Sequence, residues 1–378
     1  MKKRNVLAKS KLLCTMTFTL VLIVSCQNNS NPDVPATEPK IVGNFPLEGY
    51  WRKDFDSELE AMAWGSDVLI TGILDDGRAI IQAFDITTES SIWKHELPGN
   101  SIGINIIVVG KSVYVVFSPK LIAMDLKTGG LLFETDIQAS SIDEIAASSD
   151  GHVFVVQVSE GVYAVDRFTG KQSWEFLVGR GNVDVFSDTT HELIYIIHGD
   201  DLKAINDQDG SLEWQKQIDN QGAVQYYDGF IYYSNSEVPD GSENHLKALS
   251  LETKEVIWDF ELSEEIKCIS ATSDSIIVVT TRTLAKLDRI SGEKEWEYYI
   301  SPNVYCPTVI QNSVIFLKIG SSNQIIAMGL DDGSFLGQLD FEDSVGIGYE
   351  IPKDNLLSLT YSYPVLAFYI DNSMYIYK

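Results

Sequence analysis

Residues that could carry out chemistry are few in this chain, and their spacing builds no recognised centre. The five histidines are scattered, and no pair has the spacing of a metal site. Neither a Gly-x-Ser-x-Gly nucleophile elbow nor a phosphate-binding loop occurs. We therefore predict no catalytic residue, no cofactor-binding residue and no metal ligand. The histidines are His95, His152, His191, His198 and His245.

Two short stretches imitate ligand-binding motifs without completing them. The segment Asp207-Gln208-Asp209-Gly210 has the composition of a calcium loop, but Ile205 fills the first ligand position and Lys216 the twelfth. The segment Gly346-Ile347-Gly348 lacks the third glycine and the following helix of a dinucleotide-binding loop. We interpret the first stretch as a turn and assign no ligand to the second.

The elements that must position any functional residue come from an eleven-residue phrase that recurs eight times. The copies start 38 to 44 residues apart, and a fixed period of this length indicates one small unit repeated around a ring or along a solenoid. The copies are AFDITTESSIW (83–93), AMDLKTGGLLF (123–133), AVDRFTGKQSW (164–174), AINDQDGSLEW (204–214), ALSLETKEVIW (248–258), KLDRISGEKEW (286–296), AMGLDDGSFLG (327–337) and AFYIDNSMYIY (367–377).

Each position of the phrase has a physical reading. The third is usually Asp or Asn, whose short side chain can bond to turn backbone, and the seventh is Gly in five copies, which suits a positive φ. The last is aromatic in most copies, and we interpret this column as packing between units. Its residues, with Trp51 42 positions before Trp93, are Trp51, Trp93, Phe133, Trp174, Trp214, Trp258, Trp296 and Tyr377.

A short apolar run precedes each copy, for example Val113–Phe117 and Ile276–Val279. Runs rich in β-branched and aromatic residues predict strands, and apolar residues at consecutive positions indicate burial on both faces. With a further weak strand upstream, the unit has four strands. We predict an all-β fold, an eight-bladed β-propeller of four-stranded antiparallel blades, with a flat solenoid as the alternative. The blades are expected at about 57–97, 101–137, 141–178, 182–218, 222–262, 266–300, 304–340 and 344–378.

Asp166, Thr169, Gly170 and Trp174 form an intact Asp-x-x-Thr-Gly-x-x-x-Trp phrase. This phrase resembles the repeat of the pyrroloquinoline-quinone-like (PQQ-like) propeller family, and the similarity covers nearly all of residues 57–378. The family includes quinone-dependent alcohol and sugar dehydrogenases and also non-enzymatic propellers, notably the lipoprotein of the outer-membrane β-barrel assembly machinery. The chain looks more like the second group. The quinone enzymes use adjacent cysteines beside the cofactor, and this chain has none, so PQQ with calcium is disfavoured.

The N-terminal segment has the features of a bacterial export signal. Five basic residues precede an apolar core over 12–24, and Ile23-Val24-Ser25-Cys26 resembles a lipobox whose cysteine is acylated. We expect a signal peptide over 1–25, with ordinary secretion or a retained anchor as alternatives. A lipidated Cys26 and a flexible tether follow over 26–46. The expected location is the outer membrane, lipid-anchored and facing the periplasm or the surface.

The propeller is expected over 47–378, and residues 47–56 look like an outer strand without a preceding partner. Because closure removes open sheet edges, we predict that the strand of Trp51 pairs into the last blade. The last copy already ends in its own strand, Met374–Lys378. Either that blade has five strands or the register at the C-terminus differs from this alignment.

The chain is strongly acidic. Residues 1–26 hold five of the 28 basic residues and none of the 54 acidic ones, which leaves a net charge of −31 after residue 26. Such a chain repels nucleic acid. Solubility explains the charge, and attraction of cationic partners is the alternative.

Cys268 and Cys306 are the two cysteines of the repeat region, and each lies eight residues before an apolar run. They therefore take equivalent places in neighbouring units. Inner strands of adjacent blades usually lie too far apart for disulfide geometry, so we expect two buried thiols. A Cys268–Cys306 disulfide, which an oxidising compartment would permit, is the alternative.

The longest connection inside a unit runs from Ser234 to His245. Long loops carry function more often than strands do, so we take it as a candidate partner loop, with a tolerated insertion as the alternative. Its candidate contact residues are Glu237, Asp240, Glu243 and His245.

Together these features favour a non-catalytic, membrane-tethered scaffold that docks envelope proteins, in outer-membrane protein assembly by resemblance. The alternatives are a quinoprotein-type envelope oxidoreductase and a surface module that binds glycans or ions.

Overall fold

The computed structural model describes the repeat region as strands and turns. The described residues are 40–44, 46–47, 50–57, 59–75, 78–98, 103–117, 119–137, 144–147, 152–157, 161–179, 181, 183–188, 191–220, 222–236, 244–300, 304–311, 313–319, 324–340, 347–348, 366–370 and 373–377. Cys26, the tether up to residue 39, loop residues 237–243 and the apolar run 356–359 lie outside these ranges.

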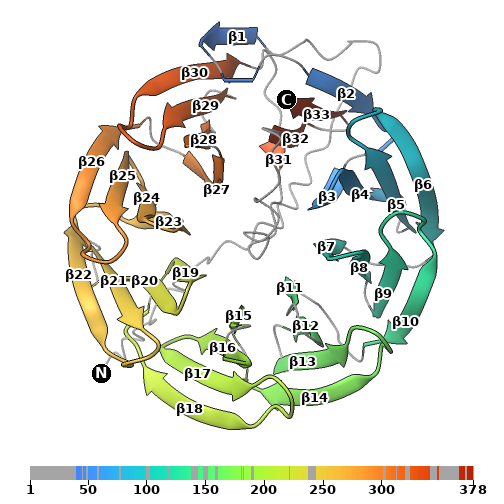
Figure 1. Cartoon of the computed structure of the whole chain (residues 1–378), viewed down its shortest axis with the longest axis horizontal. Coiled ribbons are helices and arrows are strands. Elements are labelled where there is room, and N and C mark those ends of the chain that lie inside the picture. The colour runs from blue at the N-terminus through green and yellow to red at the C-terminus, as the bar shows by residue number, and fades with distance from the viewer. Residues whose placement is uncertain are drawn as a thin grey trace, which may run out of the picture.

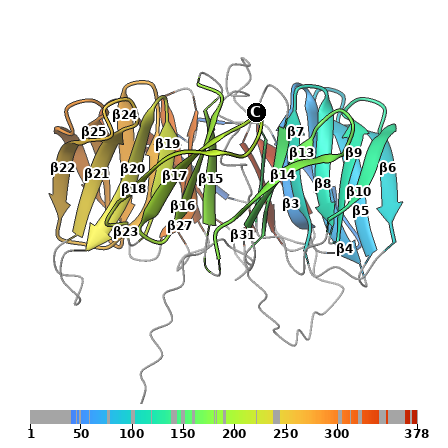
Figure 2. The same ribbon diagram turned by 90° about the horizontal axis from the view of Figure 1, so that it is seen from below.

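The strands form sheets arranged around a central axis, as Figure 1 shows, and the side view in Figure 2 shows a flat disc. In a typical sheet the first strand lies nearest the axis and the fourth lies at the rim. In sheet I, for example, each pair of successive strands is antiparallel, and a short connection of two to four residues joins them. This order places the recurring phrase on the two outer strands.

Six blades, sheets I to VI, consist of four consecutive strands each. Sheet I is β3 (Leu59–Gly65), β4 (Val68–Asp75), β5 (Arg78–Asp85) and β6 (Ser90–Leu97). Sheet II is β7 (Asn105–Val109), β8 (Ser112–Phe117), β9 (Lys120–Asp125) and β10 (Leu131–Asp136). Sheet III is β11 (Glu144–Ala147), β12 (His152–Gln157), β13 (Gly161–Asp166) and β14 (Gln172–Leu177). Sheet IV is β15 (Val183–Asp188), β16 (Leu193–His198), β17 (Asp201–Asn206) and β18 (Leu212–Gln217). Sheet V is β19 (Val224–Tyr227), β20 (Phe230–Ser236), β21 (Asn244–Ser250) and β22 (Val256–Leu262). Sheet VI is β23 (Ile266–Ala271), β24 (Ser275–Thr280), β25 (Thr283–Asp288) and β26 (Lys294–Tyr299).

The two remaining sheets contain strands from the N-terminal part of the chain. Sheet VII has five strands, β27 (Val304–Gln311), β28 (Val314–Ile319), β29 (Gln324–Gly329), β30 (Phe335–Asp340) and, outside β30, β1 (Lys40–Gly43). Sheet VIII is β31 (Ile347–Gly348), β32 (Leu366–Ile370), β33 (Ser373–Tyr377) and β2 (Tyr50–Asp54). The strand of Trp51 is thus the rim strand of the sheet that holds the C-terminus.

The prediction of an eight-bladed propeller of four-stranded antiparallel blades is therefore wrong. The described residues hold six blades of that form and two sheets that depart from it, because β1 adds a fifth strand to sheet VII and β2 enters sheet VIII from the other end of the chain. The equal period of the phrase suggested eight equal blades, but the period carries no information about where the terminal segments pair.

The assignment of the eighth copy of the phrase to the two outer strands of a blade was also wrong. Its final residue, Tyr377, lies in β33, which pairs with β32 on one side and with β2 on the other. Tyr377 is therefore buried inside the sheet, and Trp51 on β2 takes the rim position. The alignment matched 367–377 to the third and fourth strands, whereas these residues form the second and third.

Apolar side chains on both faces of the middle strands build a core between successive sheets. One cluster joins Ala63 and Ile70 of sheet I to Val115 and Met124 of sheet II, all almost fully buried. Corresponding clusters lie between other neighbouring sheets. These apolar contacts between blades stabilise the ring.

Candidate functional site

The aromatic column lies between neighbouring sheets. The indole Nε1 atoms of Trp93, Trp174 and Trp258 donate hydrogen bonds to backbone carbonyls of the next sheet, at 2.9, 2.8 and 3.1 Å. The acceptors are Leu126, Asp207 and Arg289. This column therefore fixes each blade to its neighbour, and the candidate sites are the surfaces that the blades leave open at the rim.

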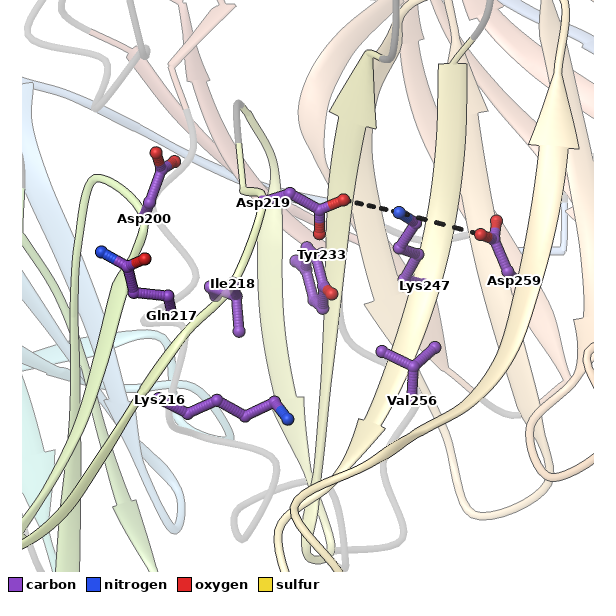
Figure 3. Close-up of a pocket in the computed structure, with 9 residues that line it drawn as sticks. All are labelled: Asp200, Lys216, Gln217, Ile218, Asp219, Tyr233, Lys247, Val256 and Asp259. Carbon is purple, nitrogen blue, oxygen red and sulfur yellow. Dashed lines mark hydrogen bonds and ion pairs between the residues drawn. The ribbon is translucent and has the colours of Figure 1, made fainter.

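A groove of about 530 Å³ opens between sheets IV and V. Residues at the end of β18 and in the connection after it form one wall, and β20, β21 and β22 form the other, as Figure 3 shows. The lining residues are Asp200, Lys216, Gln217, Ile218, Asp219, Tyr233, Lys247, Val256 and Asp259.

Lys247 is the central charge of this groove. Its Nζ atom lies 2.6 Å from Asp219 Oδ2 and 3.8 Å from Asp259 Oδ2, so it links the two walls (Figure 3). Asp219 Oδ2 also accepts a hydrogen bond of 2.7 Å from Asn235 Nδ2. His245 Nδ1 lies 2.7 Å from Asp259 Oδ1 on the far side. The network holds Lys247, whose side chain is 11% exposed, in one position.

The electrostatics of the groove follow from these contacts. Burial raises the pKa of Asp219, but hydrogen bonds from Lys247 and Tyr233 outweigh burial and leave that pKa below its ordinary value. Burial, together with the nearby Asp219 carboxylate, raises the pKa of Tyr233. The carboxylate and the phenol therefore keep fixed protonation states at neutral pH, and the groove presents fixed charges.

Three polar groups around the groove have spare hydrogen-bonding capacity among the described residues. Asn235 is 6% exposed and its Oδ1 atom accepts no hydrogen bond. The side chains of Asp200 and Gln217 line the groove, and no hydrogen bond or ion pair joins either of them to a described residue. A carboxylate and an amide at the groove mouth can bind a basic or polar group of a partner.

The structure describes only the two flanks of the predicted loop, 234–236 and 244–245, and these lie beside the groove. His245 lies in β21 and contacts Asp259, whereas Glu237, Asp240 and Glu243 lie outside the described residues. Ser236 and Asn244, which flank the connection, are paired across β20 and β21 at the end of sheet V that carries Asn235 and His245.

Sequence reasoning missed Lys247. A signal was present, because Lys247 interrupts the apolar face of a strand that ends in the recurring phrase. Lys203 stands at the equivalent place in sheet IV, where it contacts Asp201 at 3.0 Å. A buried lysine in a middle strand requires an acidic partner, and the partner comes from the connection after β18.

The cysteine expectation needs correction. Cys268 is disulfide-bonded, so the prediction of two buried thiols is wrong. Its strand β23 neighbours β27, the strand that carries Cys306, at the inner side of the ring. The inner strands of adjacent sheets converge toward the axis. This convergence brings β23 and β27 closer together than we expected from the spacing of the blades.

In the described part of the chain, no group of three or more His, Cys, Asp or Glu side chains is placed to hold a metal ion. The same residues include no helix that is long and apolar enough to cross a membrane.

Radial sheets, a repeated Asp-x-x-Thr-Gly turn and an aromatic between blades define a β-propeller whose repeats resemble those of the PQQ-like family. Comparison with known proteins confirms the resemblance to that family. A family model described as outer membrane protein assembly factor BamB matches residues 77–228. The chain is 22% identical to BamB of Yersinia pestis over 254 residues, which cover 59% of this chain and 63% of that protein. It is 24% identical to BamB of Moranella endobia (strain PCIT) over 207 residues, 48% of this chain and 50% of that protein.

The match thus spans less than two thirds of each of these relatives. Among solved structures, BamB from Moraxella catarrhalis has a TM-score of 0.65 at 16% identity and covers 88% of this chain and 99% of its own. The designed protein Ika8 has a TM-score of 0.63 at 13% identity, covering 89% and 99%. The dihydro-heme d1 dehydrogenase NirN has 0.58 at 11% identity, covering 74% and 66%. At these identities the structural likeness shows the fold alone.

Proposed function

We propose that this protein is a membrane-tethered propeller that docks other envelope proteins during outer-membrane protein assembly. The observation that supports this role best is the similarity to BamB, which appears in the family model, in two curated relatives and in a solved structure. A lipid on Cys26 and a location at the outer membrane are parts of the proposal, as is the lack of catalysis.

The groove between sheets IV and V is the proposed docking surface. Its walls are held in place by the Lys247 network, so a partner meets fixed groups rather than mobile ones. Preorganised charges lower the entropic cost of binding. Asp200 and Gln217 at the mouth are the groups that we expect to contact the partner.

A photo-crosslinking experiment in the native bacterium tests the role. A photoreactive amino acid at Gln217 should capture proteins of the outer-membrane assembly machinery, and the same amino acid at Glu297 on β26 should capture much less. Loss of the gene should lower the amount of folded outer-membrane proteins. Unchanged outer-membrane protein levels together with equal capture at both positions would contradict the proposal.

The tether is tested separately. Cells grown with labelled palmitate should label the protein, and Cys26→Ser should abolish the label and move the protein to the soluble envelope fraction. Label that survives the substitution would refute lipidation at Cys26. Turnover of alcohols or sugars after reconstitution with calcium and quinone would refute the non-catalytic part of the proposal.

A further inference from the structure

The two ends of the groove between sheets IV and V differ in charge balance. In Figure 3, Asp200 and Gln217 lie at one end, Lys247 and Asp259 lie at the other, and Asp219 lies between them. Lys247 is held at its own end by ion pairs with Asp219 and Asp259. Within the described residues, no cation therefore pairs with the Asp200 carboxylate.

The second lysine of the groove does not restore the balance. Lys216 Nζ lies 4.0 Å from Glu255 Oε1, outside the groove lining. Of the lining residues, three are carboxylates and two are lysines, so the groove has an excess of negative charge. Such a site attracts a cationic group.

A buried acceptor beside the groove independently calls for a hydrogen-bond donor. Asn235 is 6% exposed, and its Oδ1 atom has no hydrogen-bond partner. The Nδ2 atom of the same amide donates to Asp219 Oδ2 at 2.7 Å, which places the amide directly against the groove wall. A carboxylate partner also fixes which end of the amide is the oxygen. An unpaired buried acceptor is unfavourable, and an N–H donor from a ligand removes this cost.

The backbone holds the free carboxylate next to apolar surface. Ile218 N donates to the Asp200 carbonyl at 2.7 Å, which joins the turn after β16 to the connection after β18. Ile218 and Val256 are apolar members of the groove lining. Apolar surface beside a carboxylate suits lysine and arginine, whose methylene stems pack while their charged heads pair.

A metal ion fits this groove less well than a basic side chain. The described residues contain no group of three His, Cys, Asp or Glu that could hold a metal ion. In the described lining, Asp200 is the one carboxylate without an ion pair, and the other free acceptors nearby are amides. A single positive charge with several N–H donors, as in lysine or arginine, matches this set.

We infer that the groove between sheets IV and V receives a lysine or arginine side chain of a partner protein. The charged head would lie among Asp200, Gln217 and Asn235, with the stem beside Ile218 and Val256. This inference names the partner chemistry of the proposed docking surface and rests on that proposal. It is measurable on the purified protein without the natural partner.

Peptide selection on the purified full-length protein tests the inference. A phage library of short random peptides should yield sequences that contain lysine or arginine. A selected peptide, synthesised with a fluorophore, should bind about tenfold more weakly when norleucine, which keeps an apolar stem, replaces its basic residue. By fluorescence anisotropy, Asp200→Asn should weaken binding of the unchanged peptide about fivefold, and Asp200→Glu should preserve it.

Further variants separate contact in the groove from the general negative charge of the protein. Asp331→Asn, in an exposed turn of sheet VII, removes the same charge and should leave the affinity unchanged. A peptide with glutamate in place of its basic residue should bind the Asp200→Lys protein better than the original protein. Asn235→Ala should also weaken binding of the basic peptide. Circular dichroism checks its fold, and the exposed Asp200 variants test the groove independently of it.

Three results would overturn the inference: no enrichment of basic residues, equal affinity of the norleucine peptide, or equal effects of Asp200→Asn and Asp331→Asn. The capture of assembly proteins at Gln217 in cells is a separate measurement. It can fail while the peptide still binds, and it can succeed while the peptide does not. The inference and the proposed function therefore fail separately.

Discussion

The ammonium group of Lys254 lies over the indole of Trp214, 4.9 Å from the ring centroid. Lys254 occupies the turn position that five other copies fill with glycine, and it keeps the same backbone conformation, with φ of +61°. In the glycine copies the aromatic of the preceding sheet packs directly on the turn backbone, as Trp258 does on Gly292. The seventh position of the phrase therefore contacts the aromatic residue of the preceding sheet in two ways, through the backbone of a glycine or through the ammonium group of a lysine.

Gly292→Ala should destabilise the protein by about 3 kcal/mol, since the new methyl group would meet both strain and a clash. Gly292 has φ of +72°, and its Cβ would lie 2.7 Å from the Trp258 ring. Urea unfolding measures the effect. Gly229→Ala is the control, because Gly229 has φ of +77° with no atom within 4 Å of the added Cβ. It should cost only about 1 kcal/mol. Equal costs would show that packing on Trp258 contributes nothing.

Trp258→Phe should cost about 2 kcal/mol, because the Arg289 carbonyl loses its 3.1 Å hydrogen bond in a buried place. Trp214→Phe is the comparison, since the described residues include no acceptor for Trp214 Nε1, and it should cost less. Thermal unfolding of both variants measures the difference. A larger loss for Trp214→Phe would contradict the assigned role of the indole hydrogen bonds.

The stability of the protein should depend on the ionisation of Asp219 at acid pH. The folded-state pKa of Asp219 is below its ordinary value of 3.8, so its contribution is complete above that value and is lost as pH falls through the lower folded pKa. Lys247→Met removes the hydrogen bond that lowers this pKa. This substitution should lower the free energy of unfolding by about 1 kcal/mol at pH 7, a small amount because both carboxylates stay partly hydrated. It should also make the decrease of the free energy of unfolding below pH 3.8 shallower.

Urea unfolding between neutral pH and pH 3 is the measurement for this pair of proteins. Lys294→Met is a matched control, since Lys294 forms its ion pair with Glu297 on an exposed strand face. Its effect should stay below about 0.5 kcal/mol at every pH. An unchanged acid profile for Lys247→Met would disprove the coupling.

The partner of Cys268 in its disulfide is predicted to be Cys306. Their strands β23 and β27 are neighbours at the inner side of the ring, and the other two cysteines lie in the N-terminal 26 residues. Mass spectrometry of unreduced peptides should find the cross-linked pair, and Cys306→Ser should release one thiol at Cys268. The bond closes a loop between two blades, so its loss should cost about 2–4 kcal/mol. Recovery of unlinked peptides from both positions would refute the pairing.

Local chemistry explains which parts of the fold the sequence could predict. The Asp at the third position of the phrase predicts a turn because its carboxylate accepts backbone hydrogen bonds within that turn, as Asp85 does from Thr87 and Thr88 at 2.8 Å. Glycine and Trp could be interpreted for the same reason, since the contact between the turn glycine and the aromatic of the preceding sheet recurs in five copies. Sheets I to VI follow from these columns.

Pairings between residues far apart in the sequence could not be predicted from the sequence in this way. The sequence of Lys40–Gly43 is compatible with both a strand and a flexible tether. The segment is a strand because it pairs with the outer edge of β30, and that pairing leaves no signal in its own sequence. Tyr377 was misassigned because an aromatic of the right spacing fits both the third and the fourth strand. Lys247 was overlooked because its partner Asp219 lies in a connection that carries no part of the phrase.

The sheet that unites both ends of the chain sets the order of events during synthesis. Ser373 Oγ donates to Asp54 Oδ1 at 2.6 Å, although the two residues are 319 positions apart. The strand β33 must therefore be synthesised before β2 can pair with it, and until then the ring of sheets has a gap at this place. Contacts of such long range are slow to form. Loss of β33 alone would leave that gap permanent, and the unpaired edge of β2 would favour pairing between separate molecules.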